Sequence, residues 1–272
     1  MRSAAWATLA LMPLAPAIAG GQEPAALGCG LSVPEAERGP ALDSYRVGRD
    51  LVLAQRWAEA EDPLVAATRL DPLLPEAHYA LGQSYMGLKR YPEAVAAFSR
   101  SREAFACAAL SEAGRRETEQ RLDEQIRWLR DVIRKLEGDR LAQTKVTWRE
   151  VNRETPATLG QSRMLIQQLE ARLADLQRWR NRGSGPPPEV FLALGSAHFN
   201  AGSLQDAERE YRATLALDPG SGDAHNNLAV VLMLTARLEE AESEVKLAEK
   251  AGVPVSPRLK DEIRKRKETP RP

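Results

Sequence analysis

The stretch that decides the fold is ALGQSYMGLKRYPEAVAAF, residues 80–98. Small residues alternate with large ones on both sides of Tyr91 and Pro92, and proline is well tolerated at the start of a helix. Gly82 and Ala94 would lie where two helices cross, because only small side chains allow a close approach of the two backbones. The stretch therefore predicts a helix, a short turn and a second helix.

The interval recurs along the chain. Gly48 precedes Gly82 by the same interval that separates Gly195 from Ala229. Each of these small residues is followed, at one constant spacing, by an alanine, namely Ala60, Ala94, Ala207 and Ala241. An internal period of this length is typical of a solenoid, in which each unit stacks on its neighbours.

The four copies resemble the tetratricopeptide repeat, whose unit is a pair of helices and whose period this interval matches. The resemblance implies an all-α solenoid of four helix-turn-helix repeats closed by a capping helix. The expected parts are repeats at residues 41–74, 75–108, 188–221 and 222–255, followed by a capping helix and basic tail at 256–272.

Residues 109–187 break this period and carry heptads. Apolar residues at coiled-coil spacing are Leu122, Ile126, Leu129, Ile133 and Leu136, then Ile166, Leu169, Leu173 and Leu176. Gly138 and Asp139 are predicted to end the first helix. The two seams favour a long antiparallel coiled-coil-like helical hairpin, and an intermolecular coiled coil is the alternative. Trp148, between the seams, either packs on the hairpin or is exposed as a binding hot spot.

The resemblance also implies a binding surface. In tetratricopeptide folds the first helix of each unit lines a concave groove. The residues of this chain at groove positions include Tyr45, Arg49, Tyr79, Gln83, Met86, Phe199, Asn226, Asn227 and Met233. The Lys/Arg set with which some relatives clamp a C-terminal carboxylate is absent. We therefore expect the partner to be another protein that offers a helix or an extended peptide with an apolar face.

The N-terminus predicts export. Residues 1–19 are typical of a signal peptide, with an uncharged apolar stretch and a small-x-small motif that places cleavage after Ala19. Residues 20–40 are expected to be a flexible linker, because they are rich in Gly, Pro and Ala. The protein is thus expected to be periplasmic or secreted, without stable membrane insertion after cleavage. A lipid anchor at Cys29 is the less favoured alternative.

Cys29 and Cys107 are the two cysteines of the chain. They could pair in an oxidising compartment, or Cys29 could be a loop thiol and Cys107 a buried, inert one. Sequence separation alone does not decide between these alternatives, because disulfide formation depends on geometry.

Composition and motifs narrow the function further. The 272 residues include 38 Lys and Arg against 38 Asp and Glu, so no net charge draws the chain to nucleic acid or anionic lipid. The sequence offers no catalytic triad, metal-binding histidine pair or phosphate loop, and we expect neither an enzyme nor a cofactor. The expected function is a non-enzymatic scaffold for protein–protein interaction in the cell envelope or outside the cell. The alternative is a structural oligomer or accessory subunit of an envelope complex, assembled through the insert.

Overall fold

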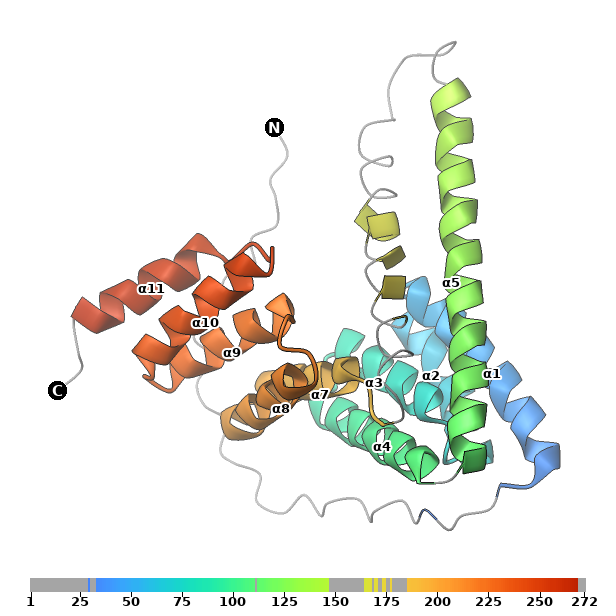
Figure 1. Ribbon diagram of the computed structural model, residues 1–272. Coiled ribbons are helices and arrows are strands. Elements are labelled where there is room, and N and C mark those ends of the chain that lie inside the picture. The colour runs from blue at the N-terminus through green and yellow to red at the C-terminus, as the bar shows by residue number, and fades with distance from the viewer. Residues whose placement is uncertain are drawn as a thin grey trace.

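The computed structural model describes residues 29, 33–110, 112–146, 164–167, 169–170, 173–174, 177 and 185–268, and every regular element among them is an α-helix. Consecutive helices form antiparallel pairs, which we call units 1 to 4 in chain order (Figure 1). The pairs are α1 (Glu35–Leu53) with α2 (Trp57–Leu70), α3 (Pro75–Gly87) with α4 (Tyr91–Ala109), α7 (Pro188–Asn200) with α8 (Leu204–Leu217), and α9 (Gly222–Leu234) with α10 (Leu238–Lys250). The predicted all-helical solenoid is confirmed.

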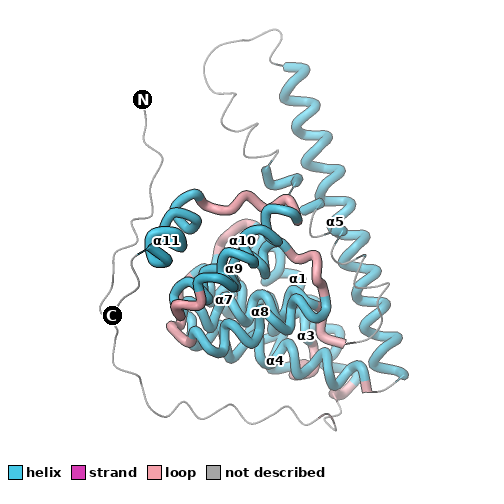
Figure 2. Tube along the Cα trace, turned by 60° about the vertical axis from the view of Figure 1, so that its left-hand side comes forward, coloured by secondary structure: helices cyan, strands magenta, loops and turns pink. Residues whose placement is uncertain are grey.

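The stack of units continues across the insert. α4 of unit 2 packs on α7 of unit 3, although residues 110–187 separate them in the chain (Figures 1 and 2). Phe98 and Leu194, which are 1% and 0% exposed, lie in one buried cluster at this junction. The insert therefore leaves and rejoins the solenoid without interrupting the packing of its units.

The small residues lie at the helix crossings, as the sequence predicted. A Cβ atom added to Gly82 would approach the ring of Phe98 to 2.6 Å, and one on Gly195 would approach Tyr211 to 2.7 Å. Gly48 faces Leu64 in the same way. The four alanines that follow the small residues at constant spacing are all fully buried: Ala60, Ala94, Ala207 and Ala241. A larger side chain at any of these points would push the paired helices apart.

The turns after units 1 and 3 share a hydrogen bond to a histidine. His78 Nε2 donates to the Pro72 carbonyl at 2.9 Å, and His225 Nε2 donates to the Pro219 carbonyl at 3.1 Å. The carboxylate of Asp71 accepts a hydrogen bond from the Leu73 amide at 2.9 Å. These histidines therefore tie the start of one unit to the turn that precedes it. Units 3 and 4 repeat the geometry of units 1 and 2.

The helix α11 (Pro257–Glu268) closes the stack, as expected of a capping helix. Leu259 and Ile263 are buried against the core of unit 4. Lys260 and Lys267 of α11 pair with glutamates of α10, so the cap is held at its edges by charge. Figure 1 shows α11 at one end of the stack and unit 1 at the other.

Two boundaries differ from the prediction. α1 begins at Glu35, so the last residues of the predicted linker 20–40 are helical; the acidic residues of its first turn favour that start. The first insert helix does not end at Gly138: α5 runs without interruption from Glu112 to Val146, 35 residues. One glycine costs a helix about 1 kcal/mol relative to alanine, and the strong helix formers around Gly138 outweigh that cost.

The second heptad segment meets the first. Ile166 and Leu169 are buried in one cluster with Leu129 and Ile133 of α5. Some predictions concern residues that lie outside the described part of the chain, so the structure does not test them. These residues are 1–28, 147–163 with Trp148, and Leu176.

Candidate functional site

The inner surface of units 1 and 2 faces the protein's own insert. α5 stands against α1 and α3 (Figure 1). Gln125 of α5 donates a hydrogen bond from Nε2 to the hydroxyl of Tyr45 at 3.3 Å. The guanidinium of Arg49 lies 3.8 Å from the centre of the Trp128 ring, within the range of a cation–π contact. Two residues expected to line an open groove, Tyr45 and Arg49, thus contact a segment of the same chain.

A buried ion pair lies further along this contact. Arg121 Nε of α5 donates to Glu76 Oε1 of α3 at 3.3 Å, and the two side chains are 12% and 8% exposed. Arg121 also pairs with Glu117 at 2.9 Å. Burial alone would lower the pKa of Arg121, but the charges of Glu76 and Glu117 raise it, so the guanidinium stays charged. The ion pair is therefore a fixed polar anchor between insert and solenoid.

Exposed ion pairs extend the contact along α1. Arg38 pairs with Glu117 at 3.8 Å and Arg46 with Glu124 at 3.6 Å, each with side chains that are about half exposed. Exposed pairs of this kind contribute little each, about 0–1 kcal/mol, and weaken with salt. The contact of α5 with α1 is thus mostly polar.

An apolar part of the contact is made with units 2 and 3. Leu122 and Ile126 of α5 are buried with Phe105 and Val190, and Tyr79 packs against this cluster. The Tyr79 ring also packs on Phe98, with centroids 5.4 Å apart. Tyr79 is therefore part of the packing between insert and solenoid. Gln83 and Met86, the other predicted groove residues of unit 2, are half-buried on α3.

The inner surface of units 3 and 4 holds the remaining predicted residues. Asn226 and Asn227 of α9 are half-buried, and Asn226 Nδ2 donates to Asn227 Oδ1 at 3.4 Å. Phe199 of α7 is half-buried at the edge of the unit 4 core. Met233 is 8% exposed, and its carbonyl accepts a hydrogen bond from Arg266 of α11 at 3.1 Å. The structure thus joins the two asparagines by a hydrogen bond, packs Phe199 on the unit 4 core and places Met233 beside the capping helix.

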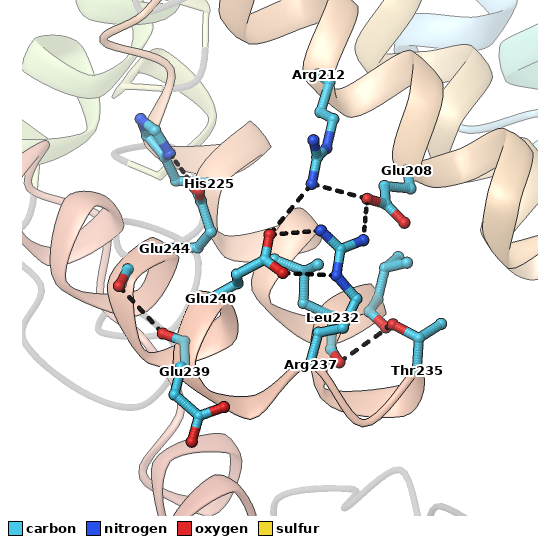
Figure 3. A network of polar contacts seen from close by, with 11 residues as sticks. Glu208, Arg212, His225, Leu232, Thr235, Arg237, Glu239, Glu240 and Glu244 are labelled. Carbon is cyan, nitrogen blue, oxygen red and sulfur yellow. Dashed lines mark hydrogen bonds and ion pairs between the residues drawn. The ribbon is translucent and has the colours of Figure 1, made fainter.

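Arginines link adjacent units in a pattern that the sequence analysis missed. Arg90 donates to Glu61 of unit 1 at 2.8 Å and to Glu93 at 3.0 Å. Arg237, at the equivalent position of unit 4, bonds Glu208 of unit 3 and Glu240 (Figure 3). These contacts raise the pKa of Arg237, chiefly through its hydrogen bond to Glu240. The sequence pattern that could have predicted these contacts has two parts. An arginine directly precedes the second helix of a unit, and a glutamate directly follows the buried alanine in the second helix of the preceding unit.

The junction between units 2 and 3 lacks this pattern, since Val95 and Ser203 occupy the two positions. It has instead a pair between Arg102 of α4 and Glu210 of α8, with both carboxylate oxygens within 3.1 Å of Arg102 Nη1. The two repeat pairs on either side of the insert are thus joined by a contact of their own.

Cys29 and Cys107 form a disulfide in the structure, with Cα atoms 5.0 Å apart. The bond ties the segment that precedes α1 to the end of α4, close to the point where the insert begins. It closes a loop that contains the helices of units 1 and 2.

Clusters that could carry metal chemistry are missing from the described parts of the chain, where no three His, Cys, Asp or Glu side chains gather as a metal site would require. Within those parts, too, no helix combines the length and apolarity needed to cross a bilayer.

The fold and the repeating contacts define a helical-repeat solenoid of the kind that presents extended binding surfaces. A model of the tetratricopeptide repeat matches residues 45–109 and 192–256, which cover the four units. The units thus match the tetratricopeptide repeat that the sequence pattern resembles. No curated protein matches the chain.

Three solved structures are among those similar to this chain. A structure reported under the functional characterisation of Pseudomonas aeruginosa pilF is 15% identical, with 86% of this chain and 87% of that chain covered and a TM-score of 0.34. YrrB, described as a TPR protein with an unusual peptide-binding site, is 17% identical over 86% and 94%, with a TM-score of 0.30. MamA MSR-1 is 18% identical over 78% and 96%, with a TM-score of 0.27.

Proposed function

We propose that the protein is a non-enzymatic scaffold that binds a partner protein in the cell envelope or outside the cell. Tetratricopeptide repeats generally mediate protein–protein interaction, which supports the first half of the proposal. The apolar N-terminal segment and the disulfide between Cys29 and Cys107 support the second half, since disulfides persist in oxidising compartments. The mass of the mature protein tests the export step, since it shows whether the chain is cleaved after Ala19.

The partner site that we propose is the inner surface of units 3 and 4. The observation that carries this choice is the position of α5, which already occupies the corresponding surface of units 1 and 2. Phe199, Asn226 and Asn227 offer a half-buried aromatic ring and two amides. Amides can bond the backbone of a bound segment while the ring packs on its apolar face.

Capture of a partner from an envelope extract tests the site. The mature chain is compared with a variant in which Asn226 and Asn227 are both changed to alanine. The matched control is Gln205→Ala, which removes an exposed amide from the outer helix α8. We expect the double variant to lose the captured protein and the control to retain it. Equal capture by both would reject this surface as the site.

We further propose that the insert is an antiparallel hairpin within one chain. Its seam residues Leu129 and Ile133 are buried against Ile166 and Leu169 of the same chain, which favours this arrangement over an intermolecular coiled coil. A structural oligomer assembled through the insert remains the alternative function. The mass of the protein in solution distinguishes these two functions. A stable dimer that dissociates in the double variant Leu129→Glu with Ile133→Glu would favour the oligomer, whereas a monomer would favour the hairpin within one chain.

A further inference from the structure

α5 shows what kind of segment the inner surface of units 1 and 2 can bind. Its contacts with that surface follow helical spacing. Arg121 pairs with Glu76, and Gln125, one turn later, bonds Tyr45. Trp128, three residues further on, packs against Arg49. A helix docked through residues at i, i+4 and i+7 is a known mode of recognition between a helix and a groove. The surface is therefore a helix-binding site, now occupied in cis.

The polar anchor of this contact is incomplete. Glu76 Oε1 accepts the hydrogen bond from Arg121 at 3.3 Å, whereas the other carboxylate oxygen, Oε2, is buried and has no hydrogen-bond partner among the described residues. A buried acceptor without a donor destabilises the contact. An arginine that approached Glu76 with two parallel N–H groups would satisfy both oxygens, as bidentate arginine–carboxylate pairs do.

The other contacts of α5 with α1 are also of a kind that can be exchanged. The ion pairs Arg38–Glu117 and Arg46–Glu124 are about half exposed, so water and salt compete with them. Release of the N-terminal half of α5 would free a surface that carries an acidic anchor, Glu76, beside two aromatic side chains, Tyr45 and Tyr79.

We propose that units 1 and 2 form a second binding surface, for a partner helix that carries an arginine directed at Glu76, and that α5 occupies this surface until such a helix displaces it. The partner class is an amphipathic helix with a basic anchor and, one to two turns further on, a polar and then an aromatic residue. The proposal rests on the scaffold function proposed above but not on its site in units 3 and 4.

The test uses the full chain and a labelled peptide of residues 112–136 as the probe, with binding read by fluorescence anisotropy. In the chain, Arg121→Glu turns the anchor of α5 into a repulsive contact with Glu76. We expect this variant to bind the peptide at least tenfold more tightly than the wild type does. The matched control is Arg134→Glu, the same change on an exposed part of α5, where the side chain is 76% exposed; it should bind as the wild type does.

The charge swap shows whether Glu76 is the anchor. A peptide carrying Arg121→Glu should bind the Arg121→Glu chain at least tenfold more weakly than the unaltered peptide does. The same altered peptide should bind tightly to a chain that carries Glu76→Arg alone, because the chain's own Arg121 is then repelled from position 76 while the peptide's glutamate pairs with it. Failure of the Arg121→Glu chain to bind better than the wild type, or equal binding of the two peptides, overturns the proposal.

A second variant keeps the test decisive if Arg121→Glu does not fold, which circular dichroism will show. Glu124→Arg places a like charge against Arg46 on the exposed side of the contact and should raise peptide affinity several-fold; unchanged affinity again overturns the proposal. Because the probe comes from the chain itself, these outcomes are independent of capture of the natural partner through Asn226 and Asn227.

Discussion

Arg102 on α4 donates to both carboxylate oxygens of Glu210 on α8, at 3.0 and 3.1 Å, across 108 residues of sequence. Glu210 is 2% exposed, and the pair lies at the junction where the insert separates units 2 and 3. It replaces the arginine–glutamate contacts that join units 1 to 2 and 3 to 4. A buried carboxylate thus takes part in the ion pair that joins the two repeat pairs at this junction.

Arg102→Ala should lower the free energy of unfolding by about 2 kcal/mol, because it leaves a buried carboxylate without its main partner; the partial exposure of Arg102 reduces the loss expected of a fully buried pair. Urea denaturation measures the change. Arg209→Ala is the control, since Arg209 reaches Glu210 only at 3.5 Å and is 65% exposed. It should cost less than about 0.5 kcal/mol. Equal losses for both variants would contradict this assignment.

Gly82→Ala should destabilise the protein by about 1–3 kcal/mol, since the added methyl group would lie 2.6 Å from the Phe98 ring and force the helices of unit 2 apart. Gly138→Ala is the matched control within α5, where nothing lies within 4 Å of the added atom. It should stabilise the protein by up to about 1 kcal/mol through helix propensity. Thermal unfolding followed by circular dichroism compares the two variants. A loss of stability in both would show that Gly82 is not required for the close approach of the two helices.

These two glycines also show which features of the fold can be predicted from the sequence. Gly82 could be assigned to a crossing because its spacing from Ala94 recurs in every unit at the period of the repeat. Gly138 was assigned to a helix end from its residue type alone, and the flanking helix formers override it. Local preferences predict a helix well and its end poorly. The free-energy cost of one unfavourable residue is small compared with the summed helix propensity of its neighbours.

The position of α5 could not be predicted for a different reason. Its heptads indicate an apolar seam but do not say which surface the seam meets. In the structure the seam is divided: Leu122 and Ile126 meet the solenoid, whereas Leu129 and Ile133 meet the second heptad segment. Contacts such as Arg121 with Glu76 join parts of the chain that no local pattern links. The groove positions were identified from the repeat pattern, but their occupation by α5 was not.

Removal of the disulfide should lower stability by up to about 4.5 kcal/mol, the loop-entropy value for the 78-residue separation between Cys29 and Cys107. The variant is Cys29→Ser with Cys107→Ser, and thermal unfolding is measured with and without a reductant. The reductant should lower the midpoint of the wild type to that of the variant and leave the variant unchanged. A wild type indifferent to the reductant would show that the bond does not stabilise units 1 and 2.

Stability should fall as the pH drops below about 6.5, in part through His78. Burial lowers the pKa of His78 from 6.5, against a smaller opposing effect of its hydrogen bond to Pro72. The unfolded chain then takes up a proton at a pH where the folded chain does not, so the contribution of neutral His78 is complete above 6.5 and is lost as the pH falls towards its folded pKa. The limiting slope for one such group is about 1.4 kcal/mol per pH unit. His78→Gln keeps a side-chain N–H for the Pro72 carbonyl but does not titrate, so urea denaturation at pH 7.5, 6.0 and 5.0 should show a shallower fall for this variant. Parallel curves for variant and wild type would mean that His78 takes up its proton equally easily in both states.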